Sequence, residues 1–186
     1  MSTFELALSF VLGIGLAAAT GFRVFLPMLI VSVAAYTGNL ALGESFRWLA
    51  TPATMLGAAA LAEIVAYYVP GLDNVLETLA TPGAFVAGTV LSAAVMTDLP
   101  PMVKWTAAVI AGSGIAGITQ GATAMLRAKS TVFTGGIGNP VIATGELVGA
   151  TLVSLLALAA PIAAIVAFLW LAIRLRRRWL RRVGPS

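Results

Sequence analysis

Long runs of residues without a charged side chain constrain this chain more than any other feature. They cover residues 6–22, 24–43, 78–97, 105–126 and 147–173. A helix needs ~20 apolar residues to cross a bilayer, and continuous rather than alternating runs favour helices over membrane-spanning strands. Only 10% of the residues are charged and 60% are hydrophobic, whereas soluble domains carry about 25% charged residues. We therefore predict an all-α, polytopic transmembrane helical bundle.

The number of crossings depends on two places where an apolar run could be broken. As one helix, residues 6–42 would extend roughly 55 Å at ~1.5 Å per residue, which exceeds a hydrocarbon core of ~30 Å. This stretch must tilt, break or turn back, and Gly21 and Pro27 are expected to mark a break or a re-entrant turn. Pro161 raises the same question for the last run. We expect about six spans; counting both halves of the first stretch gives seven, and merging the last two gives five.

Basic residues set the predicted orientation. Residues 174–182 contain six arginines, and such a cluster is retained on the cytoplasmic side of a membrane. With an even number of spans both termini are cytoplasmic, and Arg127 and Lys129 fall on the same side. We therefore predict a single transmembrane domain at 1–173 and a basic cytoplasmic tail at 174–186. The net charge of +4 reflects this tail and not a surface for nucleic acid.

Two stretches rich in small residues suggest an internal repeat. The order of glycine, alanine and threonine at 13–21 resembles the order at 112–121. If the corresponding halves, 4–98 and 102–173, hold three spans each, they must have opposite orientations, as in the inverted repeats of many transporters. A chance match is the alternative, because Gly and Ala are abundant throughout the chain.

Two charged residues interrupt the apolar runs. Arg23 follows Gly21-Phe22, and a charge at the bilayer centre costs about 3 kcal/mol on insertion scales. Two positions are open for Arg23: it faces the bundle interior and finds a partner, or the break lifts it to the interface, where it snorkels. Glu63 is the one charged residue between Trp48 and Leu72, so it lies far from either end of the helix predicted there. Because hydrocarbon disfavours the charged carboxylate, Glu63 could carry a proton, pair with Arg23, or form a structural hydrogen bond to a facing helix.

The residues at 130–140 form the second candidate site. Three glycines in four positions followed by Asn-Pro disfavour a stable helix, and non-helical backbone at membrane depth is tolerated where it lines a cavity. Its N–H groups and hydroxyls could bind an anion, or its carbonyls a cation; a surface turn is the alternative. The candidate residues are Ser130, Thr131, Thr134, Gly135, Gly136 and Asn139, with Asn39 as the counterpart in the first half.

The remaining acidic residues and the missing residue types limit the chemistry. Glu146 is expected to open the following helix, where a carboxylate either joins the site or complements the helix dipole. Asp73 and Glu77 follow a predicted turn and are expected to be solvated. The chain contains no Cys and no His, which removes thiolate and imidazole metal ligands and imidazole bases. We expect no metal, no cofactor and no catalytic residue.

Four short motifs occur in order along almost the whole chain. They are Gly21-Phe22-Arg23 with Leu26-Pro27, Ala62-Glu63 with the residues at 69–73, the residues at 130–140, and Glu146. This order resembles a bacterial integral-membrane family, domain of unknown function 4126. The resemblance implies a small multi-pass protein of the bacterial cytoplasmic (inner) membrane. It implies no activity and no substrate.

Three functions are compatible with these residues. The predicted repeat, the broken first helix, Arg23 and Glu63 favour a small transporter or channel for a small ion, an anionic solute or a lipid headgroup, with proton coupling as an option. A non-catalytic assembly or scaffold subunit, whose small-residue faces pack together, is the alternative. A lipid-modifying enzyme is the third, but no His supports its carboxylates. Expected partners are the lipid bilayer, a small ion or anionic ligand and, as an option, further copies of the chain, but no nucleic acid.

Overall fold

Helices make up all the regular structure in the part of the chain that the computed structural model describes, which is residues 3–50, 54–69, 72–97 and 99–159 with the isolated residues 170, 173 and 174. The elements are α1 (Thr3–Thr20), α2 (Phe25–Tyr36), the 3-10 helix η1 (Glu44–Ala50), α3 (Thr54–Tyr68), α4 (Leu72–Val95), α5 (Pro101–Ala107), the π-helical turn η2 (Ala108–Gly112), α6 (Ser113–Thr134) and α7 (Asn139–Ala159). The predicted all-α fold is confirmed for these residues. Pro161 and most of the arginine-rich tail lie outside them.

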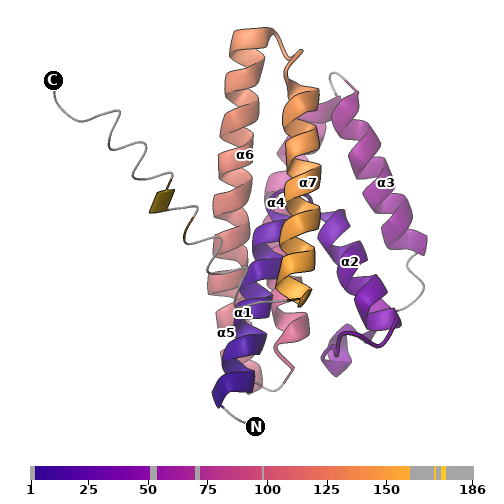
Figure 1. The fold of residues 1–186 in the computed structure, drawn as a ribbon, viewed down its shortest axis with the longest axis vertical. Helices are drawn as coiled ribbons and strands as arrows, with labels where there is room; N and C mark the ends of the chain where they lie inside the picture. The colour runs from indigo at the N-terminus through magenta and orange to yellow at the C-terminus, as the bar shows by residue number, and fades with distance from the viewer. Residues whose placement is uncertain are drawn as a thin grey trace, which may run out of the picture.

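Three of the described helices are long and apolar enough to cross a membrane. They are Val75–Val95, the continuous helix Pro101–Thr134 and Asn139–Ala159. The number rises to four if η1 and α3, which form a bent pair, count as one span. Helices α1 and α2 are apolar but shorter. Figure 1 shows α4, α6 and α7 running along the long axis of the bundle. About six spans therefore remain a prediction.

The first apolar run turns back on itself. Helix α1 ends at Thr20 and α2 begins at Phe25, and the backbone N–H groups of residues 21–23 donate to the carbonyls of Ala18 and Ala19. Figure 1 shows α1 rising from the N-terminal end of the bundle and α2 running back toward that end. The predicted break is confirmed. Pro27 lies in the first turn of α2, where its missing N–H costs no helical hydrogen bond.

Small side chains let the other helices enclose the end of α1. Helix α1 packs against α4, α6 and α7, and Leu16 to Thr20 are buried, with at most 5% exposed. The Ser92 hydroxyl of α4 donates to the carbonyl of Gly13 at 2.9 Å. Helix α4 in turn approaches the π-helical turn so closely that a Cβ added to Gly88 would lie 2.8 Å from the Gly112 carbonyl oxygen. This packing holds the break at the centre of the bundle.

The internal repeat is not confirmed. Residues 13–21 form the end of α1 and the start of the break, whereas residues 112–121 lie within a continuous helix. Gly21 packs tightly against α6, while a Cβ added to Gly121 would meet nothing within 4 Å. The two aligned stretches therefore have different structures.

Candidate functional site

Arg23 lies in the break between α1 and α2 and is the largest fully buried side chain among the described residues, with 1% exposed. Its Nη2 donates to the carbonyl of Ala143 at 3.0 Å and lies 3.8 Å from Oε2 of Glu146. Both partners belong to α7. Of the two positions that the sequence left open, Arg23 therefore takes the one that faces the interior of the bundle.

Glu63 of α3 binds the start of α2. Its Oε1 accepts a hydrogen bond from the Val24 N–H at 2.7 Å, and its Oε2 accepts one from the Phe25 N–H at 3.1 Å. A carboxylate at this position satisfies donors that have no partner within the helix and complements the helix dipole. The pairing of Glu63 with Arg23 that we considered is not formed, because the ion-pair partner of Arg23 is Glu146.

Glu146 and Arg127 join α7 to α6. Both are buried, with 4% and 5% exposed. The Arg127 Nε donates to Oε1 of Glu146 at 2.9 Å, and its Nη2 bonds to Oε2, so the pair is bidentate. The expectation that Glu146 opens its helix is wrong, because α7 begins at Asn139, about two turns earlier. The helix dipole, which acts within the first turn, does not explain this carboxylate.

Glu77 extends the cluster to α4. Its Oε2 lies 3.4 Å from Nε of Arg127 and accepts a hydrogen bond from the Tyr67 hydroxyl at 3.4 Å, while its Oε1 accepts one from Nε2 of Gln120 at 2.9 Å. The side chain is 20% exposed. The expectation of a solvated Glu77 is therefore wrong, because α4 begins at Leu72 and turns this residue toward α6. The side chain of Asp73 lies outside the described part of the chain.

The ring of Tyr67 contacts both arginines. Its centroid lies 3.8 Å from Cζ of Arg23 and 4.2 Å from Cζ of Arg127. Cation–π contacts in desolvated sites contribute about 2 kcal/mol or more. The ring and the shared carboxylate of Glu146 thus hold two positive side chains in one apolar bundle.

Two arginines and two glutamates, Glu77 and Glu146, form the ion-paired cluster, and Glu63 acts on Arg23 through its charge without forming an ion pair; the five side chains together have a formal charge of −1 when all are ionised. One proton on one carboxylate brings this charge to zero. Three guanidinium nitrogens, Nε and Nη1 of Arg23 and Nη1 of Arg127, have no hydrogen-bond partner among the described residues. Buried donors are normally satisfied, so the cluster has donor capacity beyond its own internal contacts. Within the described residues, no group of three acidic side chains converges to hold a metal ion.

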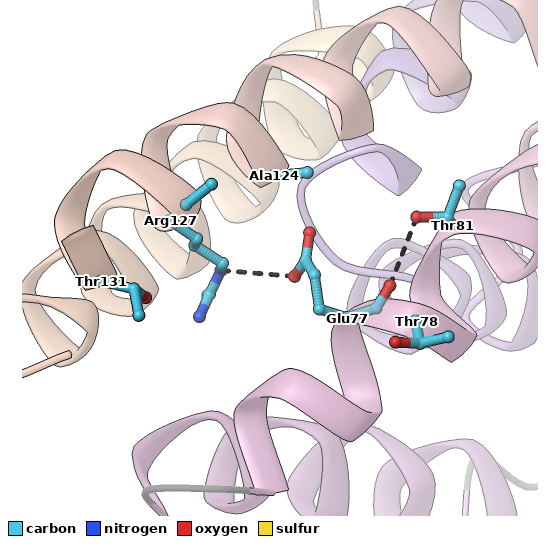
Figure 2. Close-up of a pocket in the computed structure, with 7 residues that line it drawn as sticks. Glu77, Thr78, Thr81, Ala124, Arg127 and Thr131 are labelled. Atoms are coloured by element: carbon cyan, nitrogen blue, oxygen red, sulfur yellow. Dashed lines mark hydrogen bonds and ion pairs between the residues drawn. The ribbon is translucent and has the colours of Figure 1, made fainter. Parts of the chain in front are cut away.

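A partly open pocket of about 420 Å³ lies between α4 and α6 beside the cluster. Figure 2 shows the Arg127 side chain reaching into it toward Glu77. These two residues belong to both the pocket wall and the cluster, so the pocket connects the buried charges to the outside of the bundle. The lining residues are Glu77, Thr78, Thr81, Ala124, Arg127, Ala128 and Thr131.

One family model, described as "Domain of unknown function (DUF4126)", matches residues 10–178. The chain belongs to the DUF4126 family. The resemblance drawn from the order of the short motifs is thus confirmed. Searches of curated proteins and of solved structures each found no match. The function of this DUF4126 chain therefore has to be argued from its own residues.

The glycine-rich segment of this DUF4126 chain is mostly helical. Ser130 to Thr134 form the last turn of α6, and only residues 135–138 lie between α6 and α7. Gly135 and Gly136 have φ angles of 62° and 89°, which glycine adopts readily. The Thr134 hydroxyl donates to the carbonyl of Ser130 at 2.7 Å and accepts the N–H of Gly138 at 2.9 Å. The long non-helical segment that we expected is thus a short turn, which Figure 1 shows at one end of the bundle.

Two of the residues predicted around this turn connect to the site. Thr131 lines the pocket. The buried Asn139 donates a hydrogen bond from its Nδ2 to Oγ1 of Thr131 at 3.2 Å. Asn39 is exposed and donates to the hydroxyl of Thr37 at 2.9 Å. It follows the C-terminal end of α2, which Figure 1 shows toward the opposite end of the bundle from the α6–α7 turn.

That Tyr67, Glu77, Gln120 and Arg127 belong to one cluster was not predicted from the sequence. A signal was present in α6, where Gln120, Thr123 and Arg127 recur at helical spacing and are all buried. This spacing places them on one helix face. Arg127 was instead interpreted only as an orientation signal, because it ends an apolar run.

Proposed function

We propose that this protein is a small membrane transporter that moves an anionic solute together with a proton by way of the buried charged cluster. The position of Arg127 is the observation that carries this proposal. It pairs with Glu146, contacts Glu77 and lines the pocket between α4 and α6. Because Arg127 belongs both to the buried network and to the pocket wall, an ion that binds in the pocket can alter the contact of Arg127 with Glu146 at the centre of the bundle.

The cost of burying the cluster supports a functional role. A charged side chain at the centre of a membrane helix costs about 2.5–3.5 kcal/mol on insertion scales, and such residues usually mark ion or substrate pathways. Arg23, Glu63, Arg127 and Glu146 are all buried, with at most 5% exposed. Apolar side chains would hold the helices together without this cost.

Glu77 is the carboxylate best placed to exchange the proton. It lines the pocket, whereas both oxygens of Glu63 accept backbone N–H groups. A proton on Glu77 removes the negative charge nearest to the pocket and loosens its contact with Nε of Arg127. An anion in the pocket can then bind the Arg127 guanidinium without competition from the charged carboxylate of Glu77. The break between Thr20 and Phe25 supplies a hinge, because a few non-helical residues can absorb a change in backbone angles.

Flux measurements in liposomes test this proposal. Vesicles containing the full chain and a pH-sensitive dye receive an inward gradient of chloride, phosphate or sulfate. We expect at least one anion to drive proton uptake, and Glu77→Gln to lower that uptake at least tenfold. The matched control is Glu44→Gln, because Glu44 is 87% exposed and pairs with Arg47, itself 75% exposed. Glu44→Gln should keep the wild-type flux.

An assembly subunit gives a different result in the same experiment. Under that alternative no anion drives proton uptake, and Glu77→Gln changes thermal stability or the size of the complex in detergent. Absence of flux in wild-type vesicles that hold correctly folded protein would overturn the transport proposal.

A further inference from the structure

We propose that the pocket between α4 and α6 binds a phosphate-type oxyanion. This inference rests on the proposed function and names the chemistry of its ligand. It stands on the donors that line the pocket, on the pocket's size and on its place along the helices.

The donors come from α6. The Nη1 of Arg127 has no hydrogen-bond partner among the described residues, although Arg127 is 95% buried, and Figure 2 shows its guanidinium between Thr131 and Glu77. The Thr131 oxygen already accepts the Asn139 amide, so its own O–H is directed elsewhere and can donate. A planar guanidinium beside a hydroxyl matches the oxygens of a phosphate group.

The size of the pocket favours a polyatomic ligand over a single ion. Its volume is about 420 Å³, within the range of roughly 300–1,000 Å³ that is typical of sites for small organic molecules. Two of the α6 side chains that line it, Ala124 and Ala128, are short and leave room for a ligand. A phosphate could lie against Arg127 with room left for a glycerol-sized group.

The pocket also lies near one end of the bundle. Thr131 is within one turn of the end of α6 at Thr134, and Glu77 is less than two turns from the start of α4 at Leu72. At ~1.5 Å per residue, both lie within about 8 Å of a helix end. This depth suits a phosphate that enters from water and also the phosphate of a lipid headgroup.

Glu77 makes binding depend on a proton. Its carboxylate lines the same pocket and would repel a phosphate while ionised. The groups that face it are Arg127 and Gln120 from α6 and Tyr67 from α3, with Glu146 of α7 and Arg23 at the break beyond them. Only a proton on Glu77 removes the negative charge next to the ligand. Affinity should therefore rise as the pH falls.

Equilibrium binding to the purified full chain tests the inference without any flux. The soluble probe is glycerophosphoglycerol, a phosphodiester that keeps one negative charge across the pH range used. The lipid probe is phosphatidylglycerol in mixed micelles, with phosphatidylcholine as its reference. We expect at least one probe to raise the unfolding temperature in a saturable way, while glycerol and sodium chloride at equal concentration do not. A response to the soluble probe assigns a water-borne phosphate, and a response only to the lipid assigns a headgroup.

Three variants sharpen this test. Arg127→Gln should abolish binding, but it also removes the partner of Glu146 and can unfold the protein. Thr131→Val removes one donor at nearly constant volume and should weaken binding about five- to tenfold, whereas Thr89→Val, on α4 and outside the pocket, should not change it. Glu77→Gln, which imitates the protonated carboxyl, should bind at least as tightly as wild type at low pH and lose the pH dependence.

The results separate the two proposals. Binding of neither probe, or equal effects of Thr131→Val and Thr89→Val, would overturn the phosphate site even if another anion drives proton flux. Saturable binding that Thr131→Val weakens, in a protein that shows no flux, would keep the site and reject the transport proposal. A wild-type affinity that does not change with pH would overturn the role of Glu77.

Discussion

Arg127 and Glu146 make two parallel hydrogen bonds across α6 and α7, with Nε on Oε1 at 2.9 Å and Nη2 on Oε2. Oε2 of Glu146 also lies 3.8 Å from Nη2 of Arg23. One carboxylate thus compensates two buried guanidiniums from segments far apart in the sequence. Its position makes Glu146 the residue on which the stability of the cluster most depends.

Glu146→Gln should strongly destabilise the protein. The substitution leaves Arg23 and Arg127 buried without their shared negative charge, and breaking a buried ion pair from one side costs about 3–5 kcal/mol. Thermal unfolding in detergent micelles measures the effect. The control, Glu44→Gln, removes an exposed pair with Arg47 and should leave the unfolding temperature unchanged. Equal unfolding temperatures for both variants would show that Glu146 has no special role in the fold.

Glu63→Ala should loosen the start of α2. The N–H groups of Val24 and Phe25 lose their carboxylate acceptors, and losing a helix cap costs about 0.5–2 kcal/mol. Amide hydrogen exchange at these two residues should become faster, while Glu63→Gln, which keeps one carbonyl acceptor, should give an intermediate rate. Unchanged exchange at both amides would contradict the capping role.

Gly21→Ala should destabilise the protein, whereas Gly121→Ala should not. A Cβ on Gly21 would lie 2.5 Å from the Ala116 carbonyl oxygen and 2.9 Å from the Gln120 nitrogen, and overpacking of this kind costs about 1–3 kcal/mol. A Cβ on Gly121 meets nothing within 4 Å, and alanine is the better helix former by about 1 kcal/mol. The two variants also test the predicted repeat, in which Gly21 and Gly121 are aligned. Similar unfolding temperatures for both would indicate that the two glycines have equivalent surroundings.

Substitutions of Tyr67 should separate the contribution of its ring from that of its hydroxyl. Tyr67→Phe loses only the hydrogen bond to Glu77 at 3.4 Å and should cost less than about 1 kcal/mol. Tyr67→Leu also removes the ring from beneath Arg23 and Arg127 and should cost about 2–4 kcal/mol from lost cation–π contact and packing. Denaturant unfolding of the two variants measures the difference. Equal losses would assign the contribution to the hydroxyl instead.

Features that depend on local composition were predictable from the sequence. The apolar runs indicated membrane helices because their length and lack of charge leave few other ways to bury them. The break near Gly21 followed from helix propensity and from a run too long for one crossing. For Arg23 the sequence left two positions open, a buried one with a partner and an interfacial one, because a charge in hydrocarbon is costly unless it is paired or reaches water.

Which groups meet each other was decided by the tertiary structure. The sequence did not indicate that Glu146 would pair with both arginines or that Glu63 would bind the start of α2. It also gave no sign that Glu77, which was expected to be solvated, would face the interior. Helix periodicity sets the face on which a side chain lies, but the rotation and offset of one helix against another depend on how their small residues pack. For this reason the sequence by itself determined a helical membrane protein with buried ionisable groups, and only the fold determined the cluster and the pocket that they form.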